Sequence, residues 1–451
     1  MASSKATAET PAFTRPNGLT RYRYVILAFL FAATFINYLD RATLSVVKGD
    51  IQNEIGASET QMGFILSAFA WSITLVILVF GVLMQKFGAR TIGTASIGGF
   101  SLMTLLTATA TTFPMLAVFR FGLGVFEAPT FPLNSNLARN WFPRSARAKA
   151  VSIYMTGSFF GLAFAVPLLG WILGIFNSWH SVFIFAGVLG LMITVLWWVF
   201  VRSVPNQSKR VSQAEIDLIN SEPEAPVVVD PPKPDRRDWR SVFFERRLVG
   251  IYLGAFGTST VVFFFITWFP DYLASQLGFN FKTGGAFVAA LPFICGMIGM
   301  LTSGWLSDRL VKTGKKPGEA RRVSVTIGLS GVVLIAVIPL LGRDNTAAIM
   351  AILCISFFFA GMANTAWLLA AEISKPRLLG LTTGVYGFWV NLFGALTPIV
   401  VGVILDATGK NYSMVFGYVG GTALLGALAY IFIVDKVEPS ADRRFPDGIP
   451  S

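Results

Sequence analysis

Twelve apolar runs, each long enough to cross a lipid bilayer, constrain the fold of this chain more than any other feature. A bilayer-crossing helix needs roughly 20 largely apolar residues. The runs lie approximately at 24–47, 61–83, 91–110, 114–137, 147–173, 181–202, 247–273, 284–307, 323–341, 346–371, 379–405 and 413–434. Hydrophobic residues make up 54% of the chain, and charged residues only 13%. The sequence therefore predicts an all-α membrane protein with twelve transmembrane helices.

The basic residues are distributed unevenly between the segments that join these runs. The chain has a formal net charge of +12 and 36 Lys and Arg residues, of which thirty fall on one side of the predicted membrane. Four lie on the opposite side (Lys48, Lys282, Arg343 and Lys410), and Arg41 and Arg120 lie within runs. This positive-inside bias puts both termini in the cytoplasm and accounts for the net charge without a nucleic-acid partner.

The runs divide into two sets of six, separated by a charged and Pro-rich linker. We expect a cytoplasmic tail at 1–21 that is disordered, a first six-helix half at 22–202, a cytoplasmic linker at 203–246, a second six-helix half at 247–434 and a cytoplasmic tail at 435–451. The loop stretches FGVLMQKFGAR (80–90) and SGWLSDRLVKTGKKPGEARR (303–322) occupy equivalent places in the two sets. Their similarity indicates two duplicated, pseudo-symmetric halves.

Residues typical of disulfides, metal sites or catalytic sites are sparse. No apolar stretch typical of a signal peptide precedes the first run, so that run is expected to be retained. Cys295 and Cys354 are solitary residues within runs, and His180 is the only histidine. We expect no disulfide, no metal site, no cofactor and no enzymatic activity, and we expect a monomer embedded in a lipid bilayer.

Four ionisable residues lie inside the apolar runs and need a reason to be there. Asp40 and Arg41 are in the first run, and Arg120 and Glu127 are in the fourth. A charged side chain at mid-membrane costs about 2.5–3.5 kcal/mol on insertion scales. Polar residues also recur every three to four positions from Thr34 to Ser45, which predicts a polar stripe facing a cavity.

The fourth run carries Arg120, Glu127 and Asn134 at seven-residue spacing. In an unbroken helix these residues share a face but lie too far apart to touch, because seven residues rise about 10.5 Å. Their partners must come from elsewhere, and both Asp40 and an anionic substrate are candidates for Arg120. Buried ion pairs that only fix helix packing are the alternative, which we disfavour because desolvation offsets their Coulomb energy.

The second half offers uncharged polar and aromatic side chains instead. They are Trp268, Tyr272, Asn364, Thr365, Trp367 and Asn391. A cavity with charge on one wall and hydrogen-bonding groups on the other suits a small anion that carries hydroxyl groups. Asp308, in the loop after the eighth run, is instead expected to take part in a gate.

Several motifs together resemble the major facilitator superfamily, and within it the anion:cation symporters, which include bacterial hexuronate, galactonate and glucarate transporters. The motifs are NYLDR (37–41), FRFGLGVFEAPTFP (119–132), RNWFPRSARAKA (139–150), SDR (307–309) and NLFGALTPIVVG (391–402). The resemblance covers roughly residues 22 to 434. It implies the twelve-helix major facilitator fold and a location in the bacterial inner membrane.

The resemblance also implies roles for individual residues. Arg41 would bind the substrate carboxylate, Asp40 and Glu127 would carry protons, and Arg120 would link Glu127 to substrate occupancy. The sugar-acid site would be lined by Tyr38, Asn364, Trp367 and Asn391, and Asp308 and Arg309 would act in gating.

Three positions depart from the pattern of this family. Gln85 replaces the acidic residue that is usual in the first loop motif. His180 follows Trp179 where an arginine is common, and Ile73 stands where sugar-acid carriers often place a tyrosine.

The function predicted is therefore a proton-coupled symporter that imports a small organic anion by alternating access. A hexonate, hexuronate or aldarate is the expected substrate, and an aromatic carboxylate such as phthalate, favoured by Ile73, is the alternative. Outside this class, a channel, a transporter-derived receptor and a membrane-embedded enzyme remain as alternatives.

Overall fold

The computed structural model describes residues 18–222, 235–342, 345–434 and 437, and within these ranges every regular element is helical. The α-helices are α1 (Tyr22–Val46), α2 (Lys48–Ile55), α3 (Glu59–Thr107), α4 (Phe113–Glu127), α5 (Thr130–Trp141), α6 (Arg144–Phe176), α7 (Trp179–Phe200), α8 (Gln213–Ile219), α9 (Arg236–Phe244), α10 (Arg246–Thr267), α11 (Phe269–Leu277), α12 (Gly285–Lys312), α13 (Pro317–Val332), α14 (Thr346–Ala363), α15 (Ala366–Ile373), α16 (Leu379–Ala407) and α17 (Tyr412–Phe432). Four short 3₁₀ helices are η1 (Pro205–Gln207), η2 (Phe281–Thr283), η3 (Val333–Leu340) and η4 (Pro376–Leu378).

These helices supply the twelve predicted membrane spans. Ten helical segments of the described chain have the length and apolar character needed to cross a bilayer. The 49-residue α3 supplies two more, because Gly88 interrupts it with φ 75° and ψ 160°. Only glycine adopts such a backbone conformation readily, so the chain reverses direction there. The prediction of an all-α, twelve-span membrane protein is confirmed.

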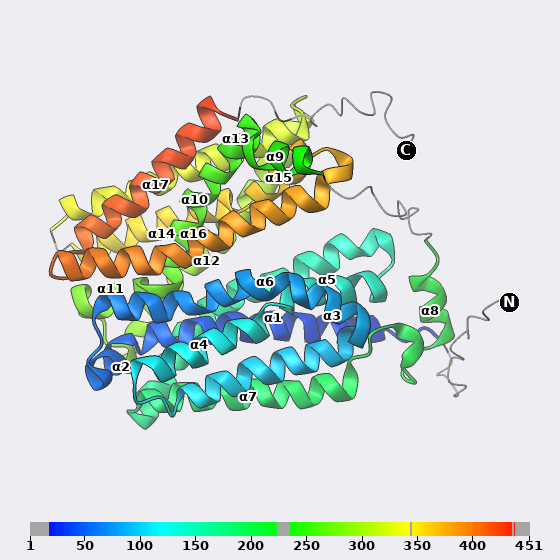
Figure 1. Cartoon of the computed structure of the whole chain (residues 1–451), viewed down its shortest axis with the longest axis horizontal. Coiled ribbons are helices and arrows are strands. Elements are labelled where there is room, and N and C mark those ends of the chain that lie inside the picture. Colours follow the sequence, from blue (N-terminus) through cyan, green and yellow to red (C-terminus); the bar gives the residue numbers. More distant parts are fainter. Residues whose placement is uncertain (1–17, 223–234, 343–344, 435–436, 438–451) are drawn as a thin grey trace.

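The spans form two bundles that meet at one end of the molecule (Figure 1). Helices α1 to α7 make the first half, and α10 to α17 make the second. Both ends of the described chain and the linker helices α8 and α9 lie at the end where the bundles diverge, which we call the linker end. We call the opposite end, where α2 and α11 lie, the closed end.

The helix pairs that join the halves include α3 with α16, α6 with α12, and α1 with α10 and α11. Glycines permit the first of these contacts. A Cβ on Gly63 would lie 2.5 Å from the Pro398 carbonyl oxygen, and one on Gly402 would lie 2.5 Å from the Glu59 carbonyl oxygen. Small residues allow helix backbones to approach this closely within a membrane.

Part of the linker is ordered. Helix α8 docks against the start of the first half, where the Glu215 carboxylate accepts hydrogen bonds from the Thr20 hydroxyl at 2.7 Å and the Tyr22 N–H at 2.9 Å. A buried carboxylate needs such donors. The predicted tails fall mostly outside the described residues.

Candidate functional site

The centre of the site is an ion pair between α1 and α4. Arg41 Nε donates to Glu127 Oε2 at 3.1 Å. The Glu127 side chain is fully buried, whereas the Arg41 side chain keeps 10% of its surface exposed. The Arg41 guanidinium also lies over the rings of Tyr38, at 4.8 Å, and Phe69, at 5.2 Å. These aromatic faces hold the guanidinium plane in place beside the carboxylate.

Glu127 is positioned by a break in the fourth span that the sequence-based reading missed. Helix α4 ends at Glu127 and α5 begins at Thr130, with Ala128 and Pro129 between them. Asn134 nonetheless faces α1, as Arg120 and Glu127 do. Its amide donates to the Thr34 hydroxyl at 3.0 Å, which ties α5 to α1. Pro129 was the available sequence signal.

Asp40 and Arg120 lie behind this pair, in the interior of the first half. Asp40 was one of two candidate partners for Arg120, whose guanidinium donates to the Asp40 main-chain carbonyl at 3.3 Å and to the Thr43 hydroxyl at 2.9 Å. Thr43 in turn donates to the same carbonyl at 2.6 Å. The Asp40 carboxyl group is buried, and neither oxygen has a hydrogen-bond partner among the described residues.

Residues from both halves line a small cavity of about 90 Å³. Tyr38 of the first half and Asn364 of the second line it together, with Ser158, Phe159, Leu162, Val262, Phe357, Ala360 and Gly361. Asn364 lies between α14 and α15, at a second helix break. Breaks in both halves thus flank the site, an arrangement that transporters use to expose polar groups within a membrane.

The other predicted wall residues lie outside this cavity lining. Trp367 follows Asn364 in α15 and is 55% exposed. Asn391, in α16, donates its amide to the carbonyl of Gly387 in the same helix at 2.9 Å. Each keeps atoms available for a ligand. Ile73, by contrast, is buried in the hydrophobic core of the first half and does not line the cavity.

An ion cluster at the closed end, centred on the buried side chains of Lys48 and Glu59, was not foreseen. Lys48 Nζ lies 2.5 Å from Glu59 Oε2 and 3.1 Å from Asp271 Oδ2. Lys410 Nζ lies 2.7 Å from Glu59 Oε1. The Asp406 carboxylate accepts from the N–H groups of Glu59 and Thr60, at 3.0 and 2.8 Å. We call this set of side chains the closed-end cluster: Lys48, Glu59, Asp271, Asp406 and Lys410.

The closed-end cluster joins the two halves directly. Lys48 and Glu59 belong to the first half, and the three remaining members belong to the second. Lys48 is only 1% exposed and lies 4.5 Å from the centre of the Trp268 ring. The hydrogen bond to Glu59 raises the pKa of Lys410, so this contact favours the charged lysine. In the sequence, Lys48 and Lys410 counted only as basic residues flanking spans.

The residues expected to act in gating lie away from the closed-end cluster, and so do the positions that depart from the family pattern. Asp308 and Arg309 are exposed at the linker end, and neither forms an ion pair with a described residue. His180 accepts or donates a hydrogen bond with Ser178 at 3.1 Å and stacks on Trp179. The Gln85 side chain lies outside the described part of the structure.

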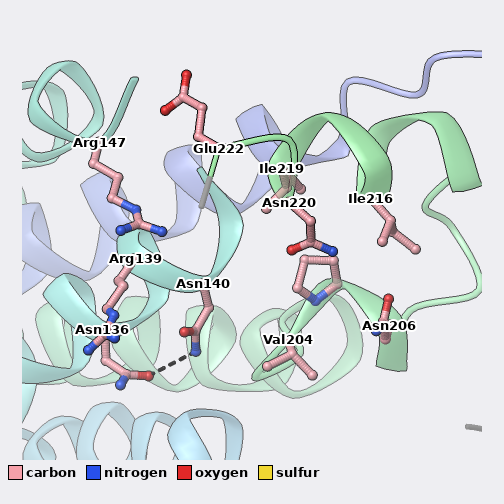
Figure 2. Close-up of a pocket in the computed structure, with 11 residues that line it drawn as sticks. Asn136, Arg139, Asn140, Arg147, Val204, Asn206, Ile216, Ile219, Asn220 and Glu222 are labelled. Carbon is pink, nitrogen blue, oxygen red and sulfur yellow. Dashed lines mark hydrogen bonds between the residues drawn. The ribbon is translucent and has the colours of Figure 1, made fainter. Parts of the chain in front are cut away.

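A separate hollow of about 520 Å³ opens at the linker end (Figure 2). Figure 2 shows Arg139 and Arg147 on one wall and the linker residues Asn206 and Asn220 on the other. Glu222, at its rim, accepts from the Ser145 N–H at 2.7 Å, and these Ser145 contacts lower the pKa of the carboxyl group. The hollow contains none of the predicted site residues and joins the linker to α5 and α6.

Known proteins were compared with the chain as a whole. Residues 30–398 match the family model described as Major Facilitator Superfamily. A D-galactonate transporter of Escherichia coli O6:H1 is 37% identical over 93% of this chain and 97% of its own length. A probable galactarate/D-glucarate transporter of Bacillus subtilis (strain 168) is 32% identical over 93% of each chain.

The fold agrees with this assignment. A crystal structure of a bacterial homologue of the human lysosomal transporter Spinster, in an inward-facing and unoccupied conformation, superposes with a TM-score of 0.68 at 19% identity, covering 92% of this chain and 96% of that one. The relatives are named as transporters, which confirms the prediction that the chain is not an enzyme. The chain is a multi-pass membrane protein that belongs to the Major Facilitator Superfamily.

Proposed function

We propose that this protein is a proton-coupled symporter that imports a sugar acid with a single carboxylate, by alternating access between its two halves. The names of the relatives support a sugar acid as substrate, since they include galactonate, galactarate and glucarate transporters and a hexuronate transporter. The Arg41–Glu127 pair is the observation that carries the proposal.

Arg41 is the carboxylate receptor in this proposal. Its planar guanidinium matches a carboxylate bidentately, and it is the partly exposed member of the pair. Glu127 is paired with this guanidinium, so a substrate carboxylate competes with an internal one. Protonation of Glu127 neutralises that competitor and frees the guanidinium.

Asp40 is the second proton carrier. Its carboxyl oxygens are buried without hydrogen-bond donors among the described residues, and an ionised carboxylate in such a place is costly. When Asp40 and Glu127 are both ionised, they balance Arg41 and Arg120, and a substrate anion enters as surplus charge. Two protons entering with one monoanion carry net positive charge inward, driven by about 2.3 kcal/mol per charge per 100 mV.

The number of available cations favours one carboxylate on the substrate. In the described spans, Arg120 is only 2% exposed, whereas the Arg41 side chain keeps 10% of its surface exposed and its guanidinium lies over the ring of Tyr38, which lines the cavity. Tyr38, Asn364, Trp367 and Asn391 present hydroxyl, amide and indole groups to the rest of the ligand. A second carboxylate, as in an aldarate, would lack a cationic partner. The alternative of phthalate loses its support, because Ile73 is buried in the core.

The positive-inside bias supports the orientation. It puts the linker end in the cytoplasm and the closed end outside the cell, so this conformation is open towards the cytoplasm. The relatives are bacterial, and we assign the protein to the inner membrane as a monomer. Asp308 and Arg309 then act in the opposite conformation, when the linker end closes.

Uptake by proteoliposomes tests the proposal. With an imposed inward proton gradient, the purified protein should concentrate a radiolabelled hexonate, and an inside-negative potential should increase the uptake. Galactonate should compete at lower concentration than galactarate. Uptake that only equilibrates would indicate a channel, no uptake despite binding would indicate a receptor, and chemically altered substrate would indicate an enzyme.

A further inference from the structure

Helix α9, at the end of the linker, has one face fixed to the second half. Asp238 is buried and forms an ion pair with Arg377, in the turn that precedes α16. Val242 is also buried, and its carbonyl accepts a hydrogen bond from the Tyr252 hydroxyl of α10 at 2.8 Å. Asp238 and Val242 are four residues apart and share this face. The orientation of α9 about its own axis is therefore set.

The rest of α9 presents arginine and aromatic side chains outward. Trp239 is 47% exposed and Phe244 is 76% exposed, and the Trp239 ring stacks on that of Phe243 with centroids 6.1 Å apart. The helix also carries three exposed arginines. Together the six side chains line a hollow of about 600 Å³: Arg236, Arg237, Trp239, Arg240, Phe243 and Phe244. We call this surface the α9 patch.

The arginines of the α9 patch carry uncompensated charge. Among the described residues, no acidic side chain forms an ion pair with Arg236, Arg237 or Arg240. Arg236 and Arg240 are one helical turn apart, so their guanidinium groups project from the same side. The nearest acidic residue on α9, Asp238, faces the opposite way and is occupied by Arg377.

The α9 patch also lies at a defined depth relative to the membrane. Helix α10, which crosses the bilayer, begins at Arg246, two residues after Phe244. The patch therefore sits where the hydrocarbon region meets the headgroups, the depth at which tryptophan and arginine side chains are favoured. Amphipathic helices with this combination of arginine and aromatic residues lie in the plane of the interface.

We propose that the α9 patch binds an anionic phospholipid of the leaflet at the linker end. Arg236, Arg237 and Arg240 hold the phosphate of the headgroup, and Trp239, Phe243 and Phe244 cover the glycerol and upper acyl chain. A free phosphate satisfies the arginines but leaves the aromatic rings uncovered, so the lipid is the occupant that matches both chemistries. The inference does not depend on the transported substrate.

Thermal unfolding of the full chain in detergent, with added lipid, tests the electrostatic part. Dioleoylphosphatidylglycerol should raise the melting temperature more than dioleoylphosphatidylcholine, and soluble glycerol 3-phosphate should not substitute for it. Replacing all three arginines (R236Q, R237Q and R240Q) should weaken the apparent lipid affinity, roughly fivefold for each arginine. The control removes the same charge from the exposed junction between α12 and α13 of the same half (K312Q, K315Q and K316Q) and should keep the wild-type response.

Equal losses in the arginine and lysine variants would overturn the proposal, because the response would then reflect only overall charge. Equal responses to the anionic and zwitterionic lipids in the wild type would do the same. If the triple variant does not fold, R240Q alone is compared with K315Q. Equal losses in these two variants would again overturn the proposal.

Tryptophan quenching in the otherwise unaltered chain tests the position of the lipid. Nanodiscs contain phosphatidylethanolamine and phosphatidylglycerol, and only one of the two lipids is brominated in each preparation. The fluorescence lost in the wild type but not in Trp239→Phe isolates Trp239. Brominated phosphatidylglycerol should quench it more strongly than brominated phosphatidylethanolamine at equal mole fraction. Equal quenching by the two lipids would show that the patch does not select an anionic headgroup.

Discussion

Lys48 of the first half lies 3.1 Å from Asp271 of the second, and only 1% of the Lys48 side chain and 14% of the Asp271 side chain are exposed. Breaking a buried pair by removing one partner costs about 3–5 kcal/mol, because the other charge is left without compensation. The pair exists only while the closed end is closed, so its energy favours this conformation over the opposite one.

Lys48→Met should therefore open the closed end. The substitution keeps an apolar stem but leaves Asp271 without its lysine. Opening can be measured by maleimide labelling of Ser45→Cys, in a protein whose Cys295 and Cys354 are replaced by alanine, since Ser45 and Asp271 line the same hollow. Lys282→Gln is the control: Lys282 also reaches across the halves, to Asn177, but is exposed. Labelling that is unchanged in Lys48→Met would show that the cluster does not hold this end closed.

Gly402→Ala should act in the same direction through packing. The added Cβ would meet the Glu59 carbonyl oxygen at 2.5 Å, and backbone cannot yield as a flexible side chain can. Overpacking of this kind costs typically 1–3 kcal/mol. Gly384→Ala, in the same helix, is the matched control, because nothing lies within 4 Å of its Cβ position. Equal labelling of Ser45→Cys in the two variants would contradict this account.

Apolar periodicity was sufficient to predict the spans, because each run must satisfy its backbone hydrogen bonds within itself in a bilayer. It could not distinguish a span that bends from one that is straight, and the break between Glu127 and Thr130 was missed for this reason. The closed-end cluster was missed for another reason. Its members are separated by up to several hundred residues in sequence, so only the packing of the two halves against each other brings them together.

The candidate site was also predictable only in part. The cost of a charge in the membrane was enough to single out Asp40, Arg41, Arg120 and Glu127. Which carboxylate pairs with which arginine depends on the rotation of α1 relative to α4, and no local sequence pattern predicts that rotation. Arg41 pairs with Glu127, and Arg120 takes a main-chain carbonyl instead of the Asp40 carboxylate.

Arg41→Lys should abolish or severely weaken substrate binding although the charge is kept. Lysine offers a compact, strongly hydrated point charge and cannot form the planar fork that holds a carboxylate. Binding can be measured as the rise in melting temperature on addition of the hexonate, which is about 2.7 kcal/mol of stabilisation at a hundredfold excess over Kd. Arg202→Lys, remote from the site, should respond like the wild type. Near-normal affinity in Arg41→Lys would mean that another group receives the carboxylate.

Asn364→Ala should lose on the order of 1–3 kcal/mol of binding, because a substrate hydroxyl is left unpaired in the cavity that Asn364 shares with Tyr38. A deoxy analogue that lacks this hydroxyl should bind the wild type and the variant almost equally. Asn391→Ala should lose less, since its amide nitrogen already bonds to Gly387. If no deoxy analogue removes the difference between Asn364→Ala and wild type, Asn364 contributes only to packing.

Glu127→Gln should separate substrate exchange from accumulation. Glutamine has the shape of a protonated glutamate and carries no charge, so Arg41 is permanently released for the substrate carboxylate. Substrate binding and exchange across the membrane should persist, whereas the proton that Glu127 would carry is lost. In proteoliposomes preloaded with unlabelled hexonate, the variant should exchange labelled substrate at a rate comparable to wild type. Under an inside-negative potential it should no longer concentrate substrate, because the one proton left on Asp40 only balances the charge of the monoanion. Under a proton gradient it should concentrate less substrate than the wild type does. Accumulation with two protons per monoanion in Glu127→Gln would contradict the assignment of Glu127 as a proton carrier. If the variant loses exchange in addition to accumulation, the charge of Glu127 is needed for the conformational change itself.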